Sequence, residues 1–126
     1  MSIRVLLVDD ETALLRSLER VLLEHDLQVE TATCAAEAAA FLNHYPFDVV
    51  VCDQNMPGQS GLELLTELRN KHPELVMMIL SGQVKGIPVA EDWAKEIGVA
   101  EVFSKPCDGN VIAEKIKSAM RYRQVT

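Results

Sequence analysis

The sequence is poor in the features that mark several large classes of protein. It has three cysteines, Cys34, Cys52 and Cys107, an odd number with no C-x-x-C pair. A disulfide framework or a cysteine metal site is therefore disfavoured, and a reducing compartment is the natural one. Basic residues are also in deficit, because 12 Lys and Arg stand against 19 Asp and Glu and give a net charge of −7. Direct binding to nucleic acid or to an anionic membrane needs a basic face, so we expect neither.

Long apolar runs are absent too. None approaches the roughly 18–20 residues of a membrane span, and the first four residues lead into a predicted strand without the pattern of a signal peptide. We therefore expect a cytoplasmic protein. With no repeat, low-complexity segment or internal linker, residues 1–126 are expected to form a single domain with its core in 3–120. Residues 121–126 then form a polar tail or the start of a linker.

What the sequence does contain is a regular alternation of two patterns. Short apolar runs, several rich in β-branched residues, alternate with segments whose apolar residues recur at helical spacing. The apolar runs are 3–8, 28–32, 49–52, 75–80 and 99–103. Five strands alternating with five helices predict an α/β fold, a doubly wound parallel sheet covered by helices on both faces.

Local signals place several helix ends. Thr33 is expected to cap the second helix, Asp108 to cap the last one, and the spacing of Ser60 and Glu63 predicts a capping box. Close packing is expected along the second helix through three small residues, Ala36, Ala39 and Ala40. Trp93 lies in the middle of the fourth predicted helix, where core packing is the usual explanation and a partner-facing anchor the minority one.

Polar residues follow four of the five apolar runs directly or within two residues. They are Asp9 and Asp10, Asp53, Ser81 and Lys105. Because the carboxyl ends of parallel strands meet at one edge of a sheet, where open α/β sheets bind ligands, we expect these side chains to converge.

Three carboxylates at one edge would repel one another unless a cation lay among them. Asp9, Asp10 and Asp53 suit Mg²⁺, a hard ion that prefers oxygen ligands and keeps several waters. The backbone carbonyl of Asn55 could supply a further ligand. Ser81 can donate a hydrogen bond to a phosphoryl oxygen, and Lys105 can neutralise one. A carboxylate nucleophile with these partners has the parts needed to accept a phosphoryl group.

These residues lie in four motifs, L-L-V-D-D-E, V-V-V-C-D-Q-N-M-P-G-Q-S-G, I-L-S-G and F-S-K-P. On these motifs the chain resembles the receiver domain of two-component response regulators over residues 3–120. The resemblance implies a flavodoxin-like (βα)5 fold with strand order 2-1-3-4-5. It implies that Asp53 is the phospho-acceptor, Asp10 a direct ligand of Mg²⁺, Asp9 an acid that holds the metal mainly through water, and Asn55 a main-chain ligand.

The resemblance also implies a switch. Ser81 would be the switch hydroxyl and Lys105 the phosphate-contacting lysine, joined to Pro106 by a cis peptide. The family often has an aromatic ring three residues before the lysine, where this chain has Val102. Phe103 is expected to point to the opposite face of the sheet and to be a poor substitute.

The function that the resemblance implies is signalling. A histidine kinase or a phosphotransfer protein would supply the phosphoryl group in a Mg²⁺-dependent reaction, and the domain would catalyse only its own phosphorylation and dephosphorylation. The output would pass through the face formed by the helix at 88–97, the strand at 99–103 and the last helix. An output domain or partner protein would read it, with homodimerisation on phosphorylation. D-Q-x-M-P-G-x-S-G with K-P-x-D also resembles receivers attached to cyclic-dinucleotide phosphodiesterase or transcription-activator outputs.

Two other functions fit parts of the pattern. An aspartyl-phosphate phosphohydrolase uses a similar fold, but it would want a second acid where Asn55 stands, and a cap domain for its substrate. A pseudo-receiver or flavin-type binding domain would leave the acids without a role. The complete set of Asp9, Asp10, Asp53, Ser81 and Lys105 disfavours it, and no phosphate-cradling glycine loop follows the first strand.

Overall fold

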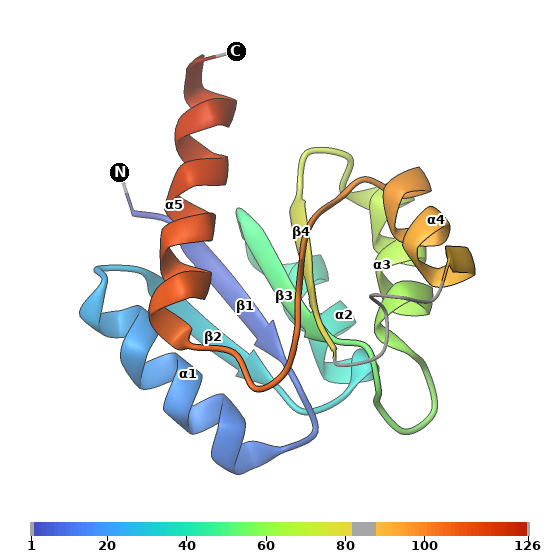
Figure 1. Ribbon diagram of the computed structural model, residues 1–126, viewed down its shortest axis with the longest axis horizontal. Helices are drawn as coiled ribbons and strands as arrows, with labels where there is room; N and C mark the ends of the chain where they lie inside the picture. Colours follow the sequence, from blue (N-terminus) through green and yellow to red (C-terminus); the bar gives the residue numbers. More distant parts are fainter. Residues whose placement is uncertain (1, 82–87, 126) are drawn as a thin grey trace.

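The computed structural model describes residues 2–81 and 88–125 and shows five strands alternating with five helices (Figure 1). The strands are β1 (Arg4–Val8), β2 (Gln28–Ala32), β3 (Val49–Asp53), β4 (Val76–Leu80) and β5 (Val99–Phe103). The helices are α1 (Thr12–Glu24), α2 (Ala35–His44), α3 (Gly61–Lys71), α4 (Pro88–Glu96) and α5 (Gly109–Val125). Each predicted element is present, with ends that differ from the prediction by one or two residues where they differ.

All five strands run parallel in the order β2-β1-β3-β4-β5. This confirms the doubly wound α/β fold and the strand order that the resemblance implied. The central strand is β3, whose five residues are all buried. Asp53 at its end pairs with Leu80 at the end of β4, so Ser81 lies one residue beyond Asp53 along the same edge. A register shift between Met77 and Met78 interrupts the pairing of β4 with β5.

The sheet separates two apolar clusters, because alternate strand residues point to opposite faces. Leu7, Val51 and Leu80 point toward α1 and α5, where they pack with Leu18 and Ile116. Side chains on the other face pack under α2, α3 and α4; they include Leu6, Val50, Ile79, Leu65 and Ala94. Figure 1 shows this division, with α1 and α5 on one side of the sheet and the other three helices on the opposite side.

The predicted helix caps have mixed outcomes. The capping box at α3 is confirmed, since the Glu63 amide donates to Ser60 Oγ and the Ser60 amide donates to Glu63 Oε1. Asp108 caps α5 by accepting from the Asn110 amide at 2.9 Å. The prediction for Thr33 is wrong, because the capping position of α2 belongs to the next residue and Thr33 bonds Glu37 instead.

Close packing along α2 also differs from the prediction. Ala36 and Ala40 are exposed and Ala39 is half-buried, whereas Ala38 is fully buried against the sheet. Because alanines lie on several sides of α2, the sequence does not show which side of the helix faces the core. The prediction therefore assigned the wrong side of α2 to the sheet. Trp93 is half-buried against the cluster under α3, as core packing requires. None of the helices in the described part of the chain is long and apolar enough to cross a membrane.

Candidate functional site

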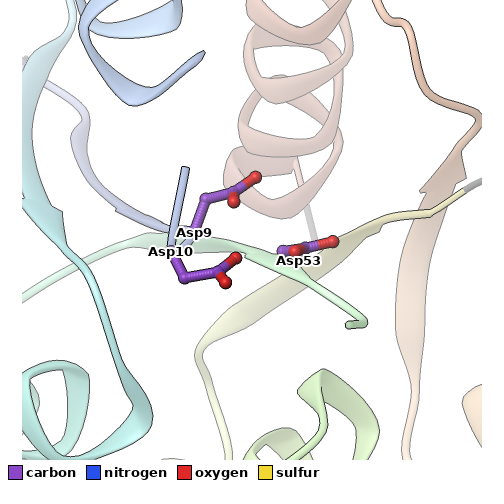
Figure 2. Close-up of side chains that lie close together, drawn as sticks. All are labelled: Asp9, Asp10 and Asp53. Carbon is purple, nitrogen blue, oxygen red and sulfur yellow. The ribbon is translucent and has the colours of Figure 1, made fainter. Parts of the chain in front are cut away.

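Three carboxylates converge where β1 and β3 end. Asp9 and Asp10 follow β1 and Asp53 is the last residue of β3, and one oxygen from each lies within 4.8 Å of the others (Figure 2). Asp9 and Asp53 are buried, at 0% and 3% exposed, whereas Asp10 is exposed. The predicted acid cluster therefore forms, with two acids inside the protein and one at its surface.

Asp9 is held by contacts on both of its carboxylate oxygens. Its Oδ1 accepts the Glu11 backbone amide at 2.9 Å, and its Oδ2 accepts Lys105 Nζ at 2.9 Å. Its own backbone amide donates to the Ala32 carbonyl, which ties the end of β1 to the end of β2. A charged group this deeply buried is tolerated because its oxygens have hydrogen-bond partners.

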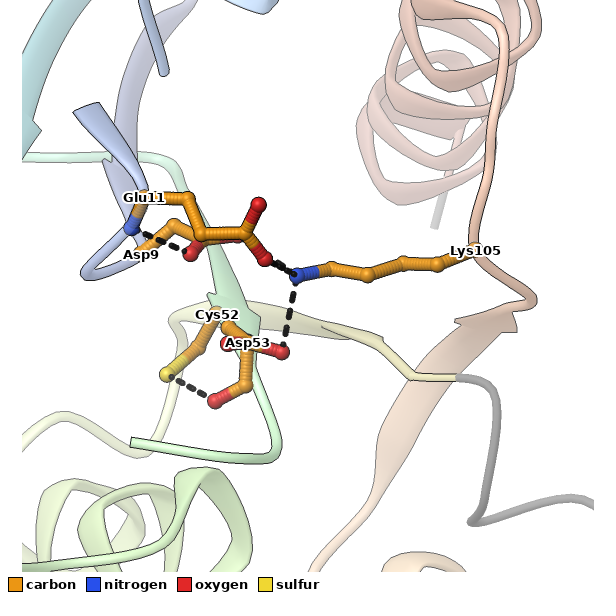
Figure 3. Close-up of polar contacts among 5 residues, drawn as sticks. All are labelled: Asp9, Glu11, Cys52, Asp53 and Lys105. Atoms are coloured by element: carbon orange, nitrogen blue, oxygen red, sulfur yellow. Dashed lines mark hydrogen bonds and ion pairs between the residues drawn. The ribbon is translucent and has the colours of Figure 1, made fainter. Parts of the chain in front are cut away.

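Lys105 reaches across the cluster from the segment after β5 (Figure 3). Its ammonium lies 2.9 Å from Asp9, 3.2 Å from Asp53 Oδ1 and 3.6 Å from Glu11 Oε1. Partial burial lowers the pKa of Lys105, but hydrogen bonds and charge from Asp9 and Asp53 together outweigh it, so the pKa lies above its usual value. The Lys105–Pro106 peptide is cis, as the resemblance implied.

Asp53 has an elevated pKa. Desolvation by burial raises it most, and the charge of Asp9 raises it further. Lys105 and the backbone amide of Asn55 lower the pKa of Asp53, but by less. Ionisation of Asp53 is therefore disfavoured in the folded protein, and added positive charge would favour the ionised form.

The other predicted residues also lie at this edge. Ser81 is buried directly after β4, and its amide donates to the Phe103 carbonyl at 2.8 Å. The side chain of Asn55 is exposed. Gly82, which follows Ser81 in its motif, falls outside the residues that the structure describes. Val102 and Phe103 pack into opposite clusters, which confirms that the Phe103 ring does not replace an aromatic at 102.

Sequence reasoning missed three residues beside the site. Glu11 adds a fourth carboxylate near Lys105. Gln54 bonds the first turn of α3, and its Oε1 accepts the Leu62 amide at 2.9 Å. A Cβ placed on Gly61 would lie 2.5 Å from the Asp53 carbonyl oxygen, so α3 begins flush against the peptide of Asp53. A glycine at the first position of a helix was the available signal for that close approach.

The donor set fits a hard divalent cation. One ammonium faces Asp9 and Asp53, and Asp10 makes no hydrogen bond or ion pair with any residue that the structure describes. The cluster therefore keeps excess negative charge and one free, exposed carboxylate, as a hydrated ion needs. A pocket of about 330 Å³ opens beside Lys105, with Leu14 and Leu18 of α1 among its walls.

Comparison with known proteins gives a consistent result. A family model described as the response regulator receiver domain matches residues 5–117. The hydrogenase transcriptional regulatory protein HoxA of Cupriavidus necator is 34% identical over 116 residues, which cover 92% of this chain and 24% of HoxA. The cell cycle response regulator CtrA of Brucella ovis is 30% identical over 120 residues, covering 94% of this chain and 50% of CtrA.

Solved structures agree with the sequence relatives. The CheY-like response regulator receiver domain protein from Methanospirillum hungatei JF-1 superposes with a TM-score of 0.91 at 26% identity, over 98% of both chains. This chain spans about a quarter of HoxA and half of CtrA. The likeness to those relatives therefore concerns one part of each.

Proposed function

The chain belongs to the response regulator receiver domain family, and on that premise we propose that Asp53 accepts a phosphoryl group. The observation that carries the proposal is the buried Asp53 carboxylate, which lies 3.2 Å from Lys105 and beside Asp9 and Asp10. A carboxylate in this setting can act as a nucleophile, and the ammonium of Lys105 is close enough to balance the negative charge that the phosphoryl group adds.

The transfer is an in-line displacement. A carboxylate oxygen of Asp53 forms a bond to the phosphorus of a phosphohistidine, and the bond from phosphorus to the imidazole nitrogen breaks. The leaving nitrogen keeps the electron pair and takes up a proton. Lys105 then exchanges part of its contact with Asp53 for a phosphoryl oxygen. Ser81, buried at the same edge, donates its hydroxyl to another phosphoryl oxygen.

The metal that suits this site is Mg²⁺. Asp10 would bind it directly, Asp9 mainly through water, and Asp53 and the main-chain carbonyl of Asn55 would complete the protein ligands. When bound, the ion neutralises charge on the phosphoryl oxygens. The chain's own chemistry is limited to phosphorylation and dephosphorylation of Asp53.

The partners follow from this chemistry. The phosphoryl group comes from a sensor histidine kinase or a phosphotransfer protein in the cytoplasm, and an output domain or partner protein reads the result. The reading surface is the α4–β5–α5 face, defined by those three elements, where the domain also dimerises on phosphorylation. In support, β5 is an edge strand with two hollows beside it, of about 280 and 570 Å³, and Tyr122 of α5 is 76% exposed there.

A phosphorylation assay tests the proposal. Incubation with Mg²⁺ and a small phosphodonor such as acetyl phosphate should add one phosphoryl group, stable in acid and labile in base. Asp53→Asn should abolish the mass gain. Asp26→Asn is a matched control, because Asp26 is exposed and its positive φ of 63° suits asparagine equally. Equal phosphorylation of the wild type and Asp53→Asn would remove Asp53 as the acceptor.

A further inference from the structure

Gln54, the residue after the proposed phospho-acceptor, is held by three hydrogen bonds. Its amide donates to the Leu80 carbonyl at 2.9 Å, and its carbonyl accepts the Gly61 amide at 3.0 Å. Its side-chain Oε1 accepts the Leu62 amide at 2.9 Å. Two of the three bonds run to the first turn of α3. The backbone that carries Asp53 is thus joined to the start of that helix.

The polar contacts continue along α3 to α4. The Thr66 hydroxyl donates to the Leu62 carbonyl at 2.6 Å and accepts from Trp93 Nε1 at 2.9 Å. One hydroxyl can do both, because it has one donor and two acceptor positions. Leu62 therefore donates its amide to Gln54 and accepts the Thr66 hydroxyl at its carbonyl, and Thr66 in turn accepts the indole N–H of Trp93 in α4.

A second set of contacts joins the residues directly after α4 to α3. Arg69 Nε donates to the Ile97 carbonyl at 2.8 Å, and Arg69 Nη2 donates to the Gly98 carbonyl at 3.3 Å. Arg69 is one turn after Thr66 on α3, and Ile97 is one turn after Trp93. Two successive turns of α3 therefore hold α4 and the residues after it in place, one through Thr66 and one through Arg69.

We propose that Gln54, Thr66 and Trp93 form a polar route through α3 that restrains α4 while Asp53 is unphosphorylated. A phosphoryl group enlarges Asp53 and adds three acceptor oxygens, so the peptide that follows it must adjust. The start of α3 has little room beside this peptide, since a Cβ added at Gly61 would lie 2.5 Å from the Asp53 carbonyl oxygen. The start of α3 then moves, and the Thr66–Trp93 hydrogen bond is weakened. This route acts beside the one through Ser81, and it rests on the proposed phosphorylation of Asp53.

Thermodynamic linkage supplies the test. A contact that belongs to the unphosphorylated state opposes binding of a phosphoryl mimic, so its removal must tighten that binding. Beryllofluoride with Mg²⁺ is titrated into the protein and its bound form is followed by ¹⁹F NMR. Thr66→Val should lower the midpoint about fivefold, the worth of one hydrogen bond. Thr31→Val, a matched change on the edge strand β2, should leave it unchanged.

Two further variants separate coupling from general destabilisation. Trp93→Phe removes the donor to Thr66, and the double variant with Thr66→Val should lower the midpoint no more than one change does, since both remove the same bond. Gln54→Met, which lacks the acceptor for the Leu62 amide, should resemble Thr66→Val.

The possible results are distinct. An unchanged or raised midpoint in both Thr66→Val and Trp93→Phe would overturn the route through α3. If the wild type itself fails to bind beryllofluoride or to accept phosphate, the proposed phosphorylation fails instead. If the wild type is phosphorylated but the variants bind beryllofluoride with the wild-type midpoint, the proposed phosphorylation stands and only the restraint through α3 is rejected.

Discussion

Lys105 is the residue that makes a cluster of buried acids tolerable. Its ammonium lies within 4 Å of Asp9, Glu11 and Asp53, and the two aspartates among them are nearly inaccessible to water. One positive charge cannot balance them all, and the pKa of Asp53 is raised first by burial and then by the charge of Asp9. We therefore expect the ionised Asp53 to destabilise the folded protein, and a bound cation or the loss of one carboxylate should relieve this.

Asp53→Asn should therefore stabilise the protein in EDTA at neutral pH. Burial and the Asp9 charge raise the pKa of Asp53 above 3.8, so ionisation favours the unfolded chain as the pH rises through the interval above that value. The increase in the free energy of unfolding caused by Asp53→Asn should be absent near pH 3.8. It should grow as the pH rises toward the pKa of Asp53 in the folded protein, and it should level off above that pKa. Lys105 keeps its 2.9 Å partner Asp9 in the variant, so the ammonium is not left unpaired.

Thermal melts across pH measure this gain, at about 4 °C per kcal/mol for a domain of this size. Millimolar Mg²⁺ should stabilise the wild type by mass action and so narrow its difference from the variant. Asp26→Asn is the control for loss of an exposed aspartate. A variant that melts below the wild type at pH 7 in EDTA would show that Asp53 contributes net stability through Lys105.

The elements position the site because strand ends and helix starts are fixed by short-range signals. Ser60 and Glu63 cap α3, and Gly61 lets that helix start against the Asp53 carbonyl. The sequence predicted the strands, most helix ends and the converging acids, since each polar residue follows an apolar run directly or within two residues. It could not predict the contacts of Gln54 or Arg69, because these cross between elements and leave no periodic trace in the sequence.

Gly61→Ala tests the contact between α3 and the acceptor strand. The new Cβ would lie 2.5 Å from the Asp53 carbonyl oxygen, so the backbone must shift at a cost of about 1–3 kcal/mol, more than alanine gains in helix propensity. We expect a lower melting temperature together with slower phosphorylation of Asp53.

Gly109→Ala is the matched comparison for that change. Gly109 also opens a helix, and its added Cβ would lie 2.9 Å from the Val21 side chain, in α1. It should lose stability while its phosphorylation rate stays near that of the wild type. If Gly61→Ala lost stability alone, with an unaltered rate, the start of α3 would have no part in positioning Asp53.

At the scale of the whole molecule, the sheet separates the acid cluster from the proposed reading surface. The acids lie at the ends of β1 and β3, in the middle of the sheet, whereas β5 is the strand at its margin. Lys105 spans the two, since it follows β5 and contacts Asp9 and Asp53. Alternation of strands and helices predicted a parallel sheet, but the order of its strands came from the family resemblance, because periodicity carries no information on neighbours.

This arrangement predicts which helices and strands respond when a phosphoryl mimic binds at Asp53. Beryllofluoride bound at Asp53 with Mg²⁺ should contact Lys105 and draw Ser81 toward it, and these two residues follow β5 and β4 beside the α4–β5–α5 face. With Val102 in place of a ring, displacement of backbone and helix must carry the change. Amide exchange should therefore alter in peptides covering α4, β5 and α5, and Trp93 fluorescence should change with it. Asp53→Asn should abolish both responses, and a response confined to α1 would show that the signalling surface is not the α4–β5–α5 face.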